Sequence, residues 1–493
     1  MGEGKIIKIY NKGVSEVITV IKKMDNENKE LKAKLAALEK ENEKLNKGLD
    51  KYEKQKKKNS TNSSKPPSSD GIGRRTKSLR KKSDKKPGGQ EGHEGSTLKL
   101  SEKPDEVITL RVDKCTNCGI DLVFMKNEGY EIRQKIDILE AKLKTIEYRA
   151  EMKTCPKCGC KNKGKFPEGV DKTTQYGENV KSLSVYLSKY QMIPYGRLSE
   201  IFKDIFKLNI SKGTLVNFNK KCYDNLEEIE SNIKQALINS EVIHCDETGI
   251  KSKGKLNWTH VVSNKKLTHY SVHEKRGTKA IDDIGIIPFF KNTMVHDCFR
   301  SYNIYNDANH AICGAHILRE LNGITDLEKQ KWAQEFFDHL IHIKKAVDDA
   351  IENGNNHLAE QIQNELSFKY DEILEKGRKE DEEINGQRYN KRANAKKSKS
   401  LNLINRLVLY KDRMLAFMYD FIIPFTNNLA EQDLRMLKVS QKISGTYRGE
   451  HGAAWTMRIN GYISTIRKNG YDLIQSLRSV FTSDRFDPTL PQS

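Results

Sequence analysis

Residues 241–316 contain a succession of short apolar segments that constrains the fold more than any other part of the chain. The expected order is strand, strand, strand, helix, strand, helix, strand, from EVIHCDETGI at 241–250 to HAICGAH at 310–316. Three strands with hairpin-length connections, followed by alternating helices and strands, predict a mixed β-sheet. We therefore expect an α/β domain that begins with the strand at 241–250.

Three acidic residues lie where chemistry is expected. Asp246 is in the first predicted strand, Asp297 ends the fourth, and Glu431 lies in the helix-like stretch TNNLAEQDLRMLKV. Phosphodiester hydrolysis needs charge neutralised on the attacking and leaving oxygens, which two Mg²⁺ ions roughly 3.5–4 Å apart do through carboxylate ligands. Strand alternation places Glu247 on the opposite face from Asp246, so Asp246 is the predicted ligand. The alternative is that these acids lie at ordinary strand edges.

An N-terminal segment at 14–56 carries apolar residues at alternating spacings of three and four. Leu recurs at one seam position and Asn at the other, within almost wholly charged sequence. This pattern predicts a parallel two-stranded coiled coil, and therefore a homodimer or a higher oligomer. The alternative is a single amphipathic helix that packs on its own domain. The seam residues are Val17, Ile21, Met24, Asn28, Leu31, Leu35, Leu38, Asn42, Leu45, Leu49 and Tyr52.

A strongly basic stretch follows at 57–105. Residues 51–100 contain 15 Lys and Arg against 5 Asp and Glu, in a chain whose formal net charge is +20. The abundance of Ser, Gly and Pro predicts a disordered linker, and the charge favours DNA as a partner over a merely solubilising tail. No apolar run reaches 18 residues and the N-terminus lacks the apolar core of a signal peptide, so we expect a soluble cytoplasmic protein.

Two CxxC pairs, each followed by Gly, lie in a predicted DNA-binding module at 106–168. The four cysteines are Cys115, Cys118, Cys155 and Cys158. This spacing indicates a zinc-ribbon-like Zn²⁺ site, and its role is predicted to be structural because four thiolates leave no open coordination position. Cys160 is a weaker alternative ligand, since it is separated from Cys158 by one residue.

Residues 170–240 are predicted to be helical. Within them, RLSEIFKDIFKLNISKGTLVNFNKKCYDN has the pattern of a helix, a short turn and a second helix capped by Ser211. This arrangement resembles a helix-turn-helix, which would bring Lys212, Lys220 and Lys221 to DNA. A helical hairpin without a DNA contact is the alternative.

The motifs HCDETGI, VHDCFRSY, HAICGAHILREL, TNNLAEQDLRMLKVSQKISG and STIRKNG follow one another along the chain. Together with NSSKPPSSDG, KKPGGQEGHEGSTL and the cysteine module, they resemble the insertion sequence 66 family of bacterial DDE transposases. The resemblance covers most of the chain. Two departures are visible, because family members commonly have Arg where Gln432 stands and an aromatic residue where Gly314 stands.

The resemblance implies a ribonuclease-H-like catalytic core at 241–316 and 421–440. A helical insertion at 317–420 would interrupt this core, and a helical segment at 441–493 would follow it. The resemblance also implies catalysis by Asp246, Asp297 and Glu431, which would hold two Mg²⁺ or Mn²⁺ ions during DNA cleavage and strand transfer.

The implied partners are double-stranded DNA, as transposon ends and as target, and accessory proteins of the same element. The implied location is the bacterial or archaeal nucleoid. On the predicted helix of Glu431, Arg435 and Lys438 follow on roughly the same face, where they would hold a phosphate, and Lys442 is a weaker candidate.

Several alternatives stay open on the sequence alone. His310, Cys313 and His316 have a spacing compatible with another metal site, although packing at a strand end is the favoured interpretation. Asn427 and Asn428 are both good N-cap residues and are expected to start and orient the helix of Glu431. A non-catalytic, dimeric, zinc-containing DNA-binding regulator and a structure-selective nuclease are the rival functions.

Overall fold

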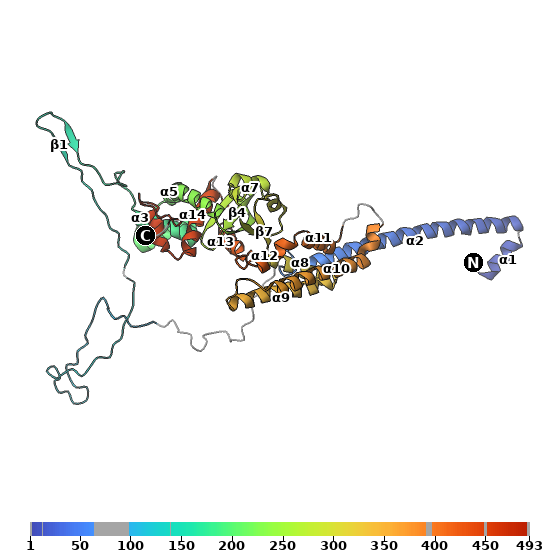
Figure 1. Cartoon of the computed structure of the whole chain (residues 1–493), viewed down its shortest axis with the longest axis horizontal. Helices are drawn as coiled ribbons and strands as arrows, with labels where there is room; N and C mark the ends of the chain where they lie inside the picture. Colours follow the sequence, from blue (N-terminus) through green and yellow to red (C-terminus); the bar gives the residue numbers. More distant parts are fainter. Residues whose placement is uncertain are drawn as a thin grey trace. The chain divides into compact units, whose positions relative to one another are not determined.

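The computed structural model describes residues 2–11, 13–63, 98–138, 140–390, 397–447 and 451–490 (Figure 1). The chain divides into two compact units. One unit consists of Met1–Lys77, Thr174–Leu198 and Lys212–Ser493, and the other of Ser78–Thr173 and Ser199–Ser211. In the described parts of the chain, no helix is both long enough and apolar enough to cross a membrane.

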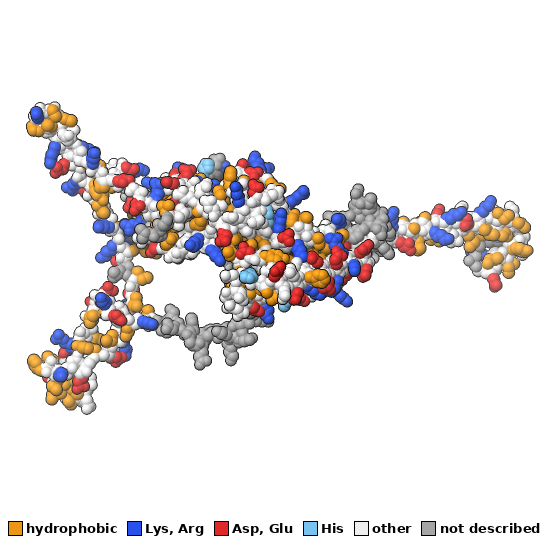
Figure 2. Space-filling view, viewed as in Figure 1, with side chains coloured by type: hydrophobic (Ala, Val, Ile, Leu, Met, Phe, Trp, Pro, Cys, Tyr) orange, Lys and Arg blue, Asp and Glu red, His pale blue; other side chains and the backbone are white. Residues whose placement is uncertain are grey.

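A single long helix, α2 (Val14–Lys56), covers the whole predicted heptad segment. It follows the short helix α1 (Glu3–Tyr10). No residue of α2 is buried within the chain, and its seam leucines are about 60% exposed, for example Leu31 at 61% and Leu38 at 59%. Hydrophobic side chains are also visible at the N-terminal end in Figure 2, where Ile6 and Ile7 of α1 are exposed. The apolar seam of α2 is therefore not covered by its own chain.

The residues directly after α2 form a turn that packs on a distant helix, α8 (Gly314–Glu328). Asn59, Ser60 and Asn62 are buried. The Asn62 side chain accepts from the Asn59 backbone N–H at 2.8 Å and donates to the Asp326 carboxylate at 3.1 Å. An added Cβ at Gly323 would lie 2.6 Å from the Asn62 carbonyl oxygen, so only glycine permits this approach. Most of the predicted basic linker, from residue 64 to residue 97, lies outside the described residues.

The smaller unit contains the two cysteine pairs and little regular structure. Its two strands, β1 (Met152–Thr154) and β2 (Lys161–Lys163), pair in antiparallel fashion on either side of the second cysteine pair. In the larger unit, helices precede the sheet, as predicted for residues 170–240. They are α3 (Glu178–Val185), the π-helix η2 (Tyr186–Tyr190), α4 (Tyr195–Phe206, shared by both units), α5 (Lys212–Asn225) and α6 (Glu227–Ile238).

Five strands form one mixed sheet in the order β5-β4-β3-β6-β7. The pairs β3–β4 and β4–β5 are antiparallel, whereas the pairs β3–β6 and β6–β7 are parallel. The predicted mixed sheet is therefore confirmed, and its strands follow one another along the chain in the predicted succession. The strands are β3 (Val242–Ser252), β4 (Lys255–Ser263), β5 (Thr268–His273), β6 (Thr293–His296) and β7 (Asn309–Ile312).

The connections between these strands differ in detail from the prediction. A helix α7 (Thr278–Ile284) and a 3₁₀ turn η3 (Ile287–Phe289) lead to β6, and the predicted helix near 301–307 is a 3₁₀ turn, η4 (Arg300–Ile304). The predicted strand at 310–316 is wrong in its second half, because β7 ends at Ile312 and Gly314 already opens α8. The apolar run therefore contains both the end of a strand and the start of a helix.

Successive side chains of β3 point to opposite faces of the sheet, so they pack into different hydrophobic cores. Ile243 and Cys245 pack with α6 and with α14 (Gly452–Lys468). Ile250 packs on the other face with α13 (Asn428–Ser444). Gly461 of α14 lies so close to β5 that an added Cβ would be 3.1 Å from the Thr268 carbonyl oxygen. The sheet is thus held between helices on both faces.

A helical region separates β7 from α13, as expected for 317–420. In Figure 1, α9 and α10 run side by side and the shorter helices follow them. Their core includes Trp332, Phe336 and Tyr370, all buried. The helices after α8 are α9 (Trp332–Glu352), α10 (Glu360–Asn390), α11 (Lys399–Leu409) and α12 (Lys411–Tyr419), and α15 (Leu473–Ser479) is near the C-terminus.

Candidate active site

Two of the three predicted acids lie beside each other on neighbouring strands. β3 and β6 pair in parallel, with His244 opposite Val295. Two residues further along the chain from His244 and Val295 come Asp246 and Asp297. Asp246, midway along β3, therefore lies beside Asp297, which directly follows the end of the parallel strand β6.

Burial dominates the electrostatics of these two acids. It raises the pKa of Asp297 to about 6 and that of Asp246 well above its ordinary value, with the Glu247 charge as the next cause for both. The Asp297 and Glu431 charges contribute to the shift of Asp246. Among the described ion pairs, none involves Asp246 or Asp297. Two partly buried carboxylates without an ion-pair partner fit a site for a hard divalent cation.

Glu247, which the alternation excluded as a ligand, is engaged elsewhere. Its side chain forms an ion pair with Arg276 at 2.8 Å and accepts a hydrogen bond from the Tyr302 hydroxyl at 2.5 Å. The Arg276 guanidinium lies over the ring of Phe299, 4.1 Å from its centroid, and the Phe299 N–H donates to Asp297 at 2.8 Å. Glu247 thus belongs to a network that supports the loop after β6.

Asn427 fixes the start of the helix that carries Glu431. It occupies the N-cap position of α13, as predicted, but its side chain makes no capping hydrogen bond. Its Nδ2 donates instead to the Cys245 carbonyl at 2.8 Å, and its Oδ1 lies 2.9 Å from His244 Nδ1. Its backbone N–H donates to the Cys313 sulfur at 3.1 Å. Asn427 therefore attaches α13 to β3 directly before Asp246.

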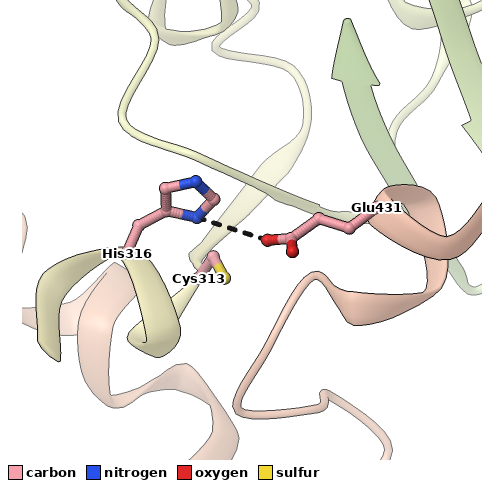
Figure 3. Close-up of side chains that lie close together, drawn as sticks. All are labelled: Cys313, His316 and Glu431. Atoms are coloured by element: carbon pink, nitrogen blue, oxygen red, sulfur yellow. Dashed lines mark ion pairs between the residues drawn. The ribbon is translucent and has the colours of Figure 1, made fainter. Parts of the chain in front are cut away.

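Glu431, in the first turn of α13, faces the start of α8. Its Oε1 lies 3.6 Å from His316 Nδ1 (Figure 3). The same oxygen lies 3.6 Å from Arg319 Nη2. Burial and the Arg319 charge lower the pKa of His316 to about 3, so the imidazole is neutral near pH 7 and Arg319 carries the compensating charge. Burial raises the pKa of Glu431, against the lowering influence of Arg319 and Arg435.

Cys313, His316 and Glu431 are close enough together to bind one metal ion. Their potential donor atoms all lie within 4.8 Å of one another, and in the described part of the chain only these three residues form such a group. Asp246, Asp297 and Glu431 are therefore not drawn together as tightly as the ligands of a single ion. Two ions roughly 3.5–4 Å apart need no such closeness, because each ion takes only part of the ligand set.

His310 lies apart from Cys313 and His316. His310 Nδ1 lies 2.9 Å from His296 Nε2, and His310 Nε2 lies 3.1 Å from the Tyr305 carbonyl oxygen. His310 is thus a buried packing residue, as the sequence favoured. His316 and Arg319, by contrast, contact Glu431, a role that the sequence analysis did not assign. The CxxH spacing was the available signal, and it was attributed to packing.

The predicted basic contacts are distributed over two helices. Arg435 and Lys442 of α13 are exposed, whereas the Lys438 ammonium donates to the Gly249 carbonyl of β3. Lys212, Lys220 and Lys221 of α5 are exposed, and Lys220 forms an ion pair with Asp224 at 2.9 Å. Lys438 therefore has a structural partner, and the others point to solvent.

The two cysteine pairs adopt the same local conformation. In each pair, the first cysteine's carbonyl accepts from the glycine N–H at 2.9 Å, and Gly119 and Gly159 have φ of 75° and 72°. Backbone N–H groups of the following residues, first that of the second cysteine, lower the pKa of Cys115 and Cys155. Such turns favour thiolates and fit a zinc ion. The four sulfurs do not form a group within 4.8 Å in the described chain.

Comparisons with known families agree with these features. A family model described as transposase IS66 family matches residues 173–455, more than half of the chain. A model described as the zinc-finger binding domain of transposase IS66 matches residues 113–159, and a family of unknown function, DUF6444, matches residues 20–99. A search of curated proteins found no match. The zinc-finger match includes all four paired cysteines and supports a structural zinc and DNA binding.

Proposed function

Because this chain belongs to the insertion sequence 66 family of transposases, we propose that it cuts and joins DNA with Asp246, Asp297 and Glu431 as its catalytic residues. The observation that carries this proposal is the register of β3 and β6, which leads to Asp246 in the central strand beside Asp297 directly after β6. The Asn427 contacts bring the first turn of α13, and with it Glu431, to the same strand.

The three acids would hold two Mg²⁺ or Mn²⁺ ions. When bound, these ions supply charge stabilisation at the attacking and leaving oxygens of the phosphodiester. The chain's own contribution is to orient the carboxylates. Asp246 and Asp297 are fixed by adjacent strands, the Phe299 N–H orients Asp297, and Arg319 holds Glu431 when no ion competes for it.

The proposed reaction has two steps. In the first, water attacks the phosphorus at the element end, the bond to the 3′ oxygen breaks, and a 3′-OH and a 5′-phosphate remain. In the second, that 3′-OH attacks a target phosphodiester and releases another 3′-OH, so one phosphodiester is exchanged for another without an external energy source.

We also propose that the core is ribonuclease-H-like. Support comes from the sheet order, in which an antiparallel three-stranded meander is followed by two parallel strands at the side of β3. On this proposal, α8 to α12 form an insertion between β7 and the helix of Glu431.

DNA contacts by Arg435, Lys442, Lys212, Lys220 and Lys221 are part of the same proposal, with Lys438 reaching a phosphate only if it releases Gly249. The uncovered seam of α2 supports pairing with a second copy, which would bring two element ends together.

The proposal is tested by cleavage of a labelled duplex that carries the element's terminal sequences. Mg²⁺ should be omitted rather than chelated, because a chelator would also remove zinc. We expect 3′-OH ends that depend on Mg²⁺ and disappear in Asp297→Asn, but persist in the matched control Asp307→Asn at an exposed site. Unchanged cutting by Asp297→Asn would refute the triad, and tight binding without cutting by the wild type would favour a regulator.

A further inference from the structure

The hairpin that joins β3 and β4 extends beyond the rest of the sheet. β3 pairs with β6 only over Val242–His244, and β4 pairs with β5 only from Trp258 onwards. The last three pairs of the β3–β4 ladder, which end at Ser252 opposite Lys255, therefore form a two-stranded ribbon of their own. The sequence of this ribbon and its turn, IKSKGKLN, contains three lysines and no acid.

The ribbon is braced from the far end of α13. The Lys253 N–H donates to the Tyr447 carbonyl at 2.9 Å, and the Tyr447 N–H donates to the Lys251 carbonyl at 3.0 Å. Tyr447 is buried in the small core that also contains Ile250 and Leu437. A two-stranded ribbon alone is marginally stable, so this third segment gives the hairpin a defined position.

The turn of the hairpin has a lysine, Lys253, at a left-handed backbone position where Asn or Gly would be more stable. Lys253 and Gly254 have φ of 51° and 75°, the pattern of a type I′ turn, in which Asn or Gly is preferred at the first position. A lysine there costs about 1 kcal/mol relative to such residues. Lys251, Lys253 and Lys255 are all exposed, and among the described ion pairs none involves Lys251 or Lys255.

Figure 2 shows Lys and Arg side chains interspersed with Asp and Glu over the body of the molecule. The hairpin differs because it is purely basic and belongs to the same strand as Asp246. From Asp246 to Ser252 the strand advances six residues, or roughly 20 Å, which is the length of about six base pairs.

We propose that this hairpin is a DNA-backbone contact, with Lys251, Lys253 and Lys255 binding phosphates within about six base pairs of the cleaved bond. The partner is the duplex itself, recognised through its phosphates and without base specificity. This inference rests on the proposed function, because it assumes that DNA lies along the strand that carries Asp246.

The test compares two double variants of the full-length protein that remove the same charge. Lys251→Gln with Lys255→Gln neutralises the hairpin, and Lys265→Gln with Lys266→Gln neutralises exposed lysines at the opposite end of β4. The plot of log Kobs against log salt concentration should become less steep by about 1.8 for the hairpin variant, which is about 0.9 for each lost phosphate contact. The control should keep the wild-type slope, and Lys251→Arg with Lys255→Arg should retain it.

Phosphate ethylation interference on the same duplex gives the position of the contact. We expect the wild type to lose binding when phosphates within about six base pairs of the cut are ethylated, and the hairpin variant to be insensitive there. A wild-type slope in the hairpin variant, or an equal loss in the control, overturns the inference. Failure of the wild type to cut with Mg²⁺ would instead refute the proposed function, so the two failures are distinguishable.

Discussion

At the scale of single residues, the buried acids carry a cost that a bound cation would remove. Asp246 and Asp297 are partly withdrawn from water and lie near Glu247, and both effects favour the protonated carboxyl. The free protein therefore contains carboxylates whose ionisation opposes folding at neutral pH. A divalent ion reverses this balance, because it binds only the ionised form.

Asp297→Asn is expected to stabilise the protein when no divalent ion is present. The folded-state pKa of Asp297, about 6, is above its ordinary value of 3.8. Neutral Asp297 thus stabilises the fold below about pH 4, and this contribution is lost as the pH rises through 6. At pH 8 the variant should gain up to about 3 kcal/mol in unfolding free energy, and below pH 4 it should gain nothing.

Urea unfolding monitored for the larger unit measures this difference, with Asp307→Asn as the control that should show no gain. Added Mg²⁺ should stabilise the wild type and leave Asp297→Asn unchanged. A variant less stable than the wild type at pH 8 without metal would contradict the argument.

Gly314 illustrates what a sequence does not reveal at this scale. An added Cβ at Gly314 would lie 2.3 Å from the ring of Phe425, which is buried. The missing side chain in CGAH is therefore matched by an aromatic ring that comes from a residue more than a hundred positions away. The sequence displays the departure from the family pattern, but the ring that fills the space becomes visible only in the fold.

At the scale of elements, the geometry of the proposed active site depends on how α13 is attached to β3. The helical sequence of the 17-residue α13 does not by itself determine where the helix begins relative to the sheet. The Asn427 side chain fixes that point, because it meets both the Cys245 carbonyl and His244. With Asn427 Nδ2 donating to the carbonyl, its Oδ1 is an acceptor, so His244 carries its proton on Nδ1.

Asn427→Ala should destabilise the larger unit by about 1–3 kcal/mol, since the Cys245 carbonyl and His244 Nδ1 lose their partner in a buried site. We also expect cleavage to need more Mg²⁺ for half-maximal rate, because Glu431 loses its fixed distance from Asp246. Asn428→Ala, one residue further along at an exposed position, is the control. Equal behaviour of the two variants in Mg²⁺ titrations would show that Asn427 has no special part in positioning.

The element order from 241 onwards follows from local patterns, and so do the long helix at 14–56 and the helical region before Glu431. Period-two and heptad spacings are properties of adjacent residues, which a sequence contains in full. The contacts of Glu431 with His316 and Arg319, and of Asn427 with β3, join residues more than a hundred positions apart. No spacing rule connects such residues, and the CxxH motif was consequently attributed to packing.

At the scale of the whole molecule, α2 leaves its apolar seam exposed, whereas the sheet and the helices around it bury their apolar side chains in shared cores. α2 is 43 residues long, or roughly 65 Å, and buries none of its seam. An exposed row of leucines over five heptads is unfavourable in water, and pairing with a second copy would remove it.

Leu31→Glu is expected to weaken self-association strongly. In a symmetric dimer the change removes two buried leucines, which corresponds to roughly 3–6 kcal/mol and at least about a hundred-fold increase in the dimer Kd. Sedimentation equilibrium of the full chain measures this Kd. Ala33→Glu introduces the same residue on the outer side of the helix and should leave the Kd nearly unchanged. A wild-type protein that is monomeric at micromolar concentration would refute the dimer.

The turn at Asn59–Ser63 also determines the rotational phase of α2. Asn62 Nδ2 donates both to the last turn of the helix, at the Lys57 carbonyl, and to Asp326 of α8. The direction in which the leucine seam faces is therefore set at this end. Each residue inserted into α2 turns the seam by about 100°, whereas a complete heptad turns it by only about 20°. Lineages that lengthen or shorten this helix would thus be restricted to steps of seven.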